Sequence, residues 1–274
     1  MNASTARSYL FVPGNRPERF DKALAAGADA VIVDLEDAVP PESKVEARAA
    51  VAGWLSARHP VLVRINAPGT AWFGEDLALC AMAGVAGVMI PKAENITDLQ
   101  RIATVALQRP LFPLIETAQG FDHARVLARA EGVQRLVFGS IDFQLDLGIR
   151  DDDEALLTFR SQLVLISRLA GIVAPVDGVT TAIDDATALE RETRRARNLG
   201  FGAKLCIHPR QVAIVNRGFA PSADDVTWAR RVLAAAEDAR GGAVALDGKM
   251  IDKPVILRAQ AIVREAEARN QPPE

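Results

Sequence analysis

Arg64, Glu116 and Asp142 each close a short apolar run typical of a β-strand, in VLVR (61–64), PLIE (113–116) and FGSID (138–142). A chain that alternates strands with helices usually closes into a parallel barrel, whose catalytic residues collect at the carboxyl ends of its strands. We therefore expect these three side chains to meet there. Two carboxylates and a guanidinium at one place suggest a site for a metal-bound oxyanion.

Further carboxylates, Asp34, Glu36 and Asp37, follow the second expected strand. A hard cation such as Mg²⁺ prefers oxygen ligands and is commonly held by one or two carboxylates together with substrate and water. Glu116 and Asp142 suit that role. Two alternatives stay open: Asp142 caps the helix that follows it, and the acids around Glu36 lie in a solvated loop.

Other side chains leave further chemistry open. Arg64 follows buried-looking residues, so it needs an anionic partner, which is either a structural carboxylate or a ligand. Lys92 and Lys204 could each form a Schiff base, as in a class I aldolase. Cys206 and His208 could bind a soft metal, but no further Cys or His lies at ligand spacing for zinc.

The elements that must position these residues alternate along the chain. Strands are expected at 8–12, 30–33, 61–65, 87–90, 111–115, 135–138, 174–180 and 203–207, the seventh being irregular. Helices are expected from about residue 17 and at about 43–57, 96–107, 119–130, 154–170 and 184–198. The sequence therefore predicts an α/β fold, a (β/α)8 TIM barrel. An open doubly wound sheet is the alternative, but no Gly-x-Gly-x-x-Gly turn follows an early strand.

Side chains alternate across a strand, so residues two apart share a face. Three such faces carry polar residues, and we expect all three to point into the barrel: Leu62, Arg64 and Asn66; Phe112, Leu114 and Glu116; Lys204, Cys206 and His208.

Residues 1–220 are expected to form the barrel, and 221–274 a C-terminal helical extension. The extension should contain a helix at about 224–239, a break at Gly241 and Gly242, a segment at 243–250 and a last helix from about Pro254. We expect it to pack on a neighbouring subunit, with disorder confined to 270–274.

Composition narrows the class of protein. The chain has 274 residues, of which 49% are hydrophobic and 24% charged, and its net charge of −3 offers no broad attraction for nucleic acid. No apolar run approaches the roughly 20 residues that span a bilayer, so no membrane insertion is expected. Two cysteines are too few for a disulfide framework, and no signal-like segment opens the chain, so a cytoplasmic location is expected.

In this order the motifs resemble the citrate lyase β-subunit and malyl-CoA lyase family of metal-dependent carbon–carbon lyases, over nearly the whole chain. The resemblance is carried by LFVPGNR (10–16), DLEDAV (34–39), RIN (64–66), LIET (114–117), FGSIDF (138–143) and CIHP (206–209).

The resemblance implies a barrel in which Glu116 and Asp142 bind Mg²⁺, with Mn²⁺ as a possible substitute. It implies that Glu36 and Asp37 hold the waters of the metal and that Arg64 binds the oxygen anion of the substrate. The substrates it implies are an oxo-acid and an acyl thioester of coenzyme A, which react through the thioester enolate. The expected assembly is a homo-oligomer, a trimer or hexamer.

Asp252, in GKMIDKP (248–254), matches a tail motif of the coenzyme A-using members, where the aspartate acts as general acid or base and commonly comes from the neighbouring subunit. An N-cap before Pro254 is the alternative reading. Arg16, Arg19 and Lys22 are candidates for the coenzyme A phosphates, or else an exposed helix face.

One departure affects the substrate: many citrate lyase β-subunits have glutamate before the metal-binding aspartate, where Ile141 stands here. The intact tail favours a free coenzyme A thioester. The sequence therefore predicts a cytoplasmic Mg²⁺-dependent lyase of the malyl-CoA or citramalyl-CoA class, with or without thioester hydrolysis. The alternatives are the citryl lyase subunit of an acyl-carrier-protein complex and a non-catalytic barrel serving as a binding or assembly subunit.

Overall fold

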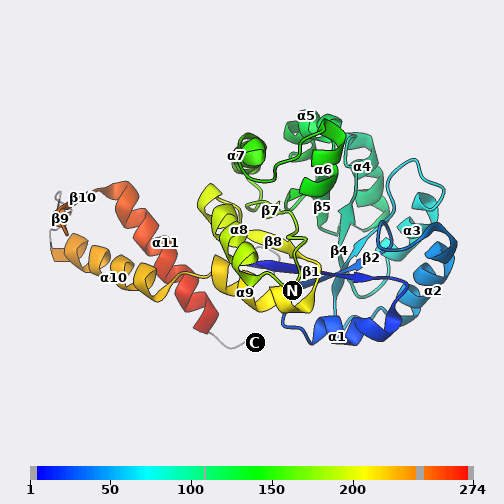
Figure 1. The fold of residues 1–274 in the computed structure, drawn as a ribbon, viewed down its shortest axis with the longest axis horizontal. Helices are drawn as coiled ribbons and strands as arrows, with labels where there is room; N and C mark the ends of the chain where they lie inside the picture. The colour runs from blue at the N-terminus through cyan, green and yellow to red at the C-terminus, as the bar shows by residue number, and fades with distance from the viewer. Residues whose placement is uncertain (1–4, 108, 239–243, 271–274) are drawn as a thin grey trace. The chain divides into compact units, whose positions relative to one another are not determined.

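Eight parallel strands close into a barrel in chain order, with β1 paired to both β2 and β8 (Figure 1). The computed structural model describes residues 5–107, 109–238 and 244–270. The strands are β1 Ser8–Pro13, β2 Ala30–Asp34, β3 Val61–Arg64, β4 Val85–Ile90, β5 Leu111–Ile115, β6 Val137–Phe138, β7 Val176–Asp177 and β8 Ala203–Cys206. The predicted (β/α)8 fold is therefore confirmed.

Helices follow the strands and form the outer ring. They are α1 Phe20–Leu24, α2 Lys44–Trp54, α3 Phe73–Cys80, α4 Ile96–Val105, α5 Ala118–Leu127, α6 Ser140–Leu147, α7 Glu154–Ala170, α8 Ala186–Leu199 and α9 Pro209–Phe219, with 3-10 turns η1 Pro17–Arg19 and η2 Pro41–Ser43. Proline opens both 3-10 turns, where its missing N–H loses no needed hydrogen bond.

The alternation of side chains along each strand separates two apolar layers. One layer fills the barrel and includes Tyr9, Ile32, Leu62, Phe112 and Leu205. The larger layer lies between the strands and the outer helices. Because residues two apart share a face, Arg64 continues the inner face of Leu62, and Glu116 continues that of Leu114.

The prediction for β8 is wrong about its faces. Leu205 belongs to the layer that fills the barrel, whereas Cys206 belongs to the layer under the helices. Lys204 therefore also points outward, where its ammonium meets Asp177 of the neighbouring strand. A buried lysine can stand on an outer face only because carboxylates there compensate its charge.

The chain divides into two compact units, Met1–Phe219 and Ala220–Glu274. The second unit comprises α10 Ala223–Asp238, an antiparallel hairpin of β9 Val244–Leu246 and β10 Lys249–Ile251, and α11 Lys253–Asn270. Its own small core is Ala229, Val232, Ile251 and Ala259. The hairpin was not predicted, although Asp247 and Gly248 both have positive φ, as a tight hairpin turn requires.

Two predicted features lie outside the described residues: the break at Gly241 and Gly242, and the disorder expected for 270–274, except that Asn270 is the last residue of α11. Among the described residues, no helix combines the length and apolarity needed to cross a membrane.

Candidate active site

A cavity of about 370 Å³ opens at the carboxyl ends of the barrel strands. Its polar wall contains Asp34, Asp37, Arg64, Glu116 and Asp142, so the three residues that motivated the sequence prediction line one cavity. The rest of the wall is apolar or small: Phe11, Pro13, Ala38, Leu114, Phe138, Gly139, Ser140, Ile141, Val179, Leu205 and Ile207.

Glu116 follows β5 and is buried at the floor of the cavity. Its Oε1 accepts a hydrogen bond of 2.7 Å from the backbone N–H of Lys92, a residue held at φ 45°. Burial, together with the nearby carboxyl groups of Glu36 and Asp142, raises the pKa of Glu116 to about 8. An additional cation beside these carboxyl groups would reverse that effect.

Asp142 is not at the end of a strand, as the sequence suggested. Strand β6 ends at Phe138, and Asp142 lies in the first turn of α6, where it is half-buried. The apolar run continues into the helix because Ile141 and Phe143 belong to α6. Glycine at position 139 allows the start of α6 to lie against the Glu116 side chain, since a Cβ there would lie 2.6 Å from both Cβ and Oε2 of Glu116.

Arg64 is held by Asp34, the residue opposite it in the β2–β3 register. Its Nε and Nη2 donate to the two Asp34 carboxylate oxygens at 2.6 and 2.7 Å, a bidentate pair in which both residues are buried. Burial alone would lower the pKa of Arg64, but Asp34 and Glu36 keep it above its ordinary value. The structure thus contains the ion pair that the sequence left open, and Arg64 still lines the cavity.

Glu36 lies between the side chains of Arg64 and Lys92 and contacts both. Its Oε2 lies 3.0 Å from Nη1 of Arg64, and its Oε1 accepts from Nζ of Lys92 at 3.0 Å. Asp37 is largely exposed, with its Oδ2 3.7 Å from the same guanidinium nitrogen. Burial raises the pKa of Glu36 despite Arg64, and the adjacent Asp37 adds to the rise. Glu36 is buried, so the solvated-loop alternative does not describe it.

The donor set fits a hard divalent cation completed by small ligands. Among the described residues, no group of three or more His, Cys, Asp or Glu side chains is arranged to hold a metal. A Mg²⁺ site needs only one or two protein carboxylates when substrate and water supply the rest. Glu116 and Asp142 provide such a pair beside open cavity space, and the raised pKa of Glu116 shows that the existing cations do not compensate its charge.

The side chains considered for other chemistry are otherwise engaged. Burial lowers the pKa of Lys92, but Glu36 outweighs that effect and raises it, which is unfavourable for a Schiff-base amine. Lys204 is buried and donates to the backbone carbonyl of Gly178 at 2.8 Å. Cys206 is buried too, and its pKa is raised to about 12 by that burial.

The candidates for coenzyme A phosphates lie at the β1–α1 junction. Arg16, Arg19 and Lys22 are all exposed there. Arg16 donates to Glu18 at 2.8 Å, and Arg19 lies 3.8 Å from the same carboxylate oxygen. Any phosphate at this place would compete with Glu18.

Asp252 belongs to the second unit of the chain and is exposed. Its Oδ1 accepts from the backbone N–H of Val255 at 3.2 Å, which makes it the N-cap of α11. The cap was the alternative reading of this residue, and it uses only one carboxylate oxygen.

Sequence reasoning missed two parts of the site. Asp34 was seen only as one acid among three, although its place opposite Arg64 in a parallel pair could have identified it as the partner. Gly139 carried no signal, because its role depends on the long-range approach of Glu116.

A family model for HpcH/HpaI aldolase/citrate lyase matches residues 7–209. The chain is 38% identical over 265 residues to a citrate lyase subunit beta-like protein of Mycobacterium tuberculosis, covering 94% of each chain. It is 34% identical over 271 residues to a (3S)-malyl-CoA thioesterase of Cereibacter sphaeroides, covering 96% of this chain and 95% of the other.

Among solved structures, the chain resembles that of the M. tuberculosis protein CitE in complex with magnesium, acetoacetate and coenzyme A. The two have a TM-score of 0.87 and 37% sequence identity over 96% of this chain and 99% of the other.

Proposed function

The chain belongs to the HpcH/HpaI aldolase/citrate lyase family, and from this premise we propose that it is a Mg²⁺-dependent carbon–carbon lyase. Its substrate would be a 3-hydroxyacyl-CoA of the malyl-CoA or citramalyl-CoA class, cleaved or formed through the thioester enolate, with or without hydrolysis of the thioester. The observation that carries the proposal is the desolvated carboxyl of Glu116, whose pKa is raised beside Asp142 at an open cavity.

Glu116 and Asp142 would hold the cation, while Glu36 and Asp37 would bind its waters. When bound, Mg²⁺ would supply Lewis-acid stabilisation of the oxygen on which negative charge develops. Arg64 would add a guanidinium aimed at that oxygen. Asp34 fixes two of its three nitrogens, so the guanidinium is preorganised and needs little rearrangement as the charge forms.

The thioester needs a place for its phosphates and a proton-transfer group. Arg16, Arg19 and Lys22 would take the coenzyme A phosphates after releasing Glu18. Asp252 would act as general acid or base, with the second unit packed on a neighbouring copy of the chain in a trimer or hexamer. The cap uses Oδ1 alone, which leaves Oδ2 for proton transfer.

The cavity wall favours an oxo-acid with an uncharged substituent. Arg64 is the one cation among the described residues that line it, and Asp34 already neutralises that charge. A second carboxylate, as in the oxaloacetate formed from a citryl thioester, would meet Leu114, Phe138, Val179 or Leu205 instead. This supports glyoxylate or pyruvate as the oxo-acid and does not favour the citryl alternative. No observation favours a non-catalytic barrel.

The test is a screen of malyl-CoA, citramalyl-CoA and citryl thioesters, and of acetyl-CoA with each oxo-acid, in the presence of Mg²⁺. We expect cleavage of the first two, loss of activity with EDTA, and recovery when Mg²⁺ is restored. Unchanged activity in EDTA would contradict the proposal, and borohydride trapping on Lys92 would then indicate a Schiff base. Citryl thioester as the best substrate would support the alternative.

The shared site has a separate test. Arg64→Ala and Asp252→Ala subunits should each be inactive alone and regain part of the activity when mixed. If mixing restores nothing while Asp252→Ala alone keeps full turnover, the tail aspartate is a helix cap without a catalytic role.

A further inference from the structure

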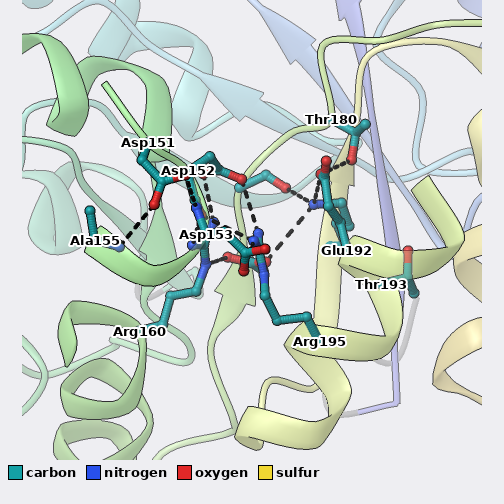
Figure 2. Close-up of polar contacts among 12 residues, drawn as sticks. Asp151, Asp152, Asp153, Ala155, Arg160, Thr180, Glu192, Thr193 and Arg195 are labelled. Carbon is teal, nitrogen blue, oxygen red and sulfur yellow. Dashed lines mark hydrogen bonds and ion pairs between the residues drawn. The ribbon is translucent and has the colours of Figure 1, made fainter. Parts of the chain in front are cut away.

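A second group of charged side chains lies behind the barrel wall, between α7, α8 and the outer faces of β7 and β8. Its innermost members, Arg160, Asp177 and Lys204, are at most 1% exposed. Nε of Arg160 donates to Asp177 at 3.0 Å. Figure 2 shows Arg160 and Arg195 converging on the loop of Asp151, Asp152 and Asp153 before α7, with Glu192 beside Thr180. We call this group the rear cluster.

Lys204 connects the rear cluster to the chain that follows β7. Its Nζ donates to the carbonyl of Gly178 at 2.8 Å and lies 3.6 Å from Glu192 and 3.9 Å from Asp177. Strand β7 is only two residues long, so the barrel ladder gives the next residues little support. Side chains hold them instead: Gly178 through Lys204, and Thr180 through its hydrogen bond to Glu192.

Gly178 in turn sets the position of the first residue of α6. A Cβ on Gly178 would lie 2.3 Å from Oγ and 3.0 Å from Cβ of Ser140, so the two residues are in direct contact. Ser140 is buried and begins the helix turn that contains Asp142. On the other side of that turn, Gly139 packs against Glu116. The turn is therefore confined between Gly178 and Glu116.

We propose that Lys204 is a positioning residue for the metal pair: by holding Gly178 against Ser140, it fixes the first turn of α6 and so places Asp142 opposite Glu116. This inference rests on the proposed function, because it assumes that Asp142 is a metal ligand. Lys204 acts through the backbone and contributes no atom to the cavity, whose lining does not include it.

The contact between Gly178 and Ser140 can be tested with one substitution that introduces a steric clash and a second that relieves it. The φ of Gly178 lies outside the left-handed region, so Gly178→Ala acts through packing: the added Cβ would lie 2.3 Å from Oγ of Ser140 and 3.1 Å from the carbonyl oxygen of Phe138. We expect its Mg²⁺ affinity, measured by calorimetry without substrate, to fall about tenfold, as is typical when the support of a metal ligand is lost. Ser140→Gly removes the closest of these contacts, so the double variant should regain most of the affinity. Wild-type affinity in Gly178→Ala, or no recovery in the double variant, would overturn the proposal.

Lys204 itself needs a control that separates positioning from stability. Lys204→Met and Arg195→Met each remove one cation from the rear cluster, but Arg195 donates its hydrogen bonds to Asp152 and Asp153, in the loop before α7, whereas Lys204 donates to Gly178. Both variants should unfold at lower urea concentration. Only Lys204→Met should bind Mg²⁺ about tenfold more weakly. Equal affinity in the two variants would reduce Lys204 to a structural role.

The same titrations separate this inference from the proposed function. Wild-type protein that binds no Mg²⁺, or Glu116→Gln that binds it as well as wild type, would overturn the proposed function and this inference with it. Normal binding in the wild type, loss in Glu116→Gln and no loss in Lys204→Met would overturn the positioning role alone.

Discussion

The barrel contains two groups of buried charges that differ in how their charges are compensated. In the cavity, Glu116 is desolvated among other carboxyl groups, and its pKa is raised to about 8. In the rear cluster, burial would likewise raise the pKa of Asp177, but Lys204 and Arg160 lower it below its ordinary value. Equal burial thus has opposite outcomes. A cluster that neutralises itself serves the fold, whereas one that does not is suited to bind a cation.

Glu116→Gln should break the cavity group most completely. Losing one of the two proposed protein ligands would remove several kcal/mol of charge stabilisation, so we expect kcat for the preferred thioester to fall by about 10³-fold or more. Because the variant also removes a desolvated carboxyl group, its urea midpoint at pH 7 should equal or exceed that of wild type. A variant that loses stability as well as activity would contradict the contrast drawn between the two groups.

Arg160→Met should have the opposite profile. It leaves Asp177 buried with fewer partners, and breaking a buried pair costs about 3–5 kcal/mol of unfolding free energy. Urea denaturation followed by circular dichroism measures this loss. Arg48→Met is a matched control, because it breaks another pair, with Asp76, on a less buried guanidinium. A similar or larger loss in the control would mean that the rear cluster is not exceptionally stabilising.

Arg64→Lys should reduce activity less than the loss of Glu116. The ammonium keeps the charge but cannot reproduce the bidentate pair with Asp34, so the cation is no longer held in place. We expect kcat to fall about 10²-fold, as for the loss of one preorganised donor, with the Mg²⁺ affinity within about threefold of wild type. A proportionate loss of Mg²⁺ binding would instead assign Arg64 to the metal site.

The pH dependence of Mg²⁺ binding should give the smallest effect. The pKa of Glu116 is about 8 in the folded protein against an ordinary 4.5, so its proton stabilises the metal-free fold below pH 4.5, and this contribution is lost as the pH rises toward 8. A cation must displace that proton. The affinity should therefore rise up to about tenfold per pH unit between pH 6 and 7 and level off above 8.

Calorimetry in buffers of different ionisation enthalpy measures the released proton directly. Glu116→Gln should retain only a weak, pH-independent affinity. If its affinity rises with pH as steeply as that of wild type, another group is responsible.

The sequence predicted those features that depend on local periodicity. The two-residue period correctly placed Arg64 on the face of Leu62 and Glu116 on that of Leu114, because these strands continue apolar runs to their ends. The same period gave the wrong face for Lys204. A buried lysine can face outward here because Asp177, on the neighbouring strand, compensates its charge. Partners that register brings together, such as Asp34 and Arg64, are likewise not visible in a single segment.

The boundary between β6 and α6 could not be predicted from the sequence, for a different reason. The mostly apolar stretch LVFGSI (136–141) does not show where a strand ends and a helix begins. The change at Gly139 depends on how closely the Glu116 side chain approaches the backbone, which is decided by another strand.

Lys92 performs two separable tasks with one residue. Its backbone, at φ 45°, directs an N–H to Glu116, and its side chain directs an ammonium to Glu36. A left-handed conformation costs an ordinary residue on the order of 1 kcal/mol, which glycine would avoid. Lys92 therefore combines a strained backbone with an ammonium that pairs with the buried carboxyl group of Glu36. Lys92→Gly would relax the backbone but leave the buried carboxyl group of Glu36 without its ammonium partner, and the change in urea midpoint would show which of the two effects is larger.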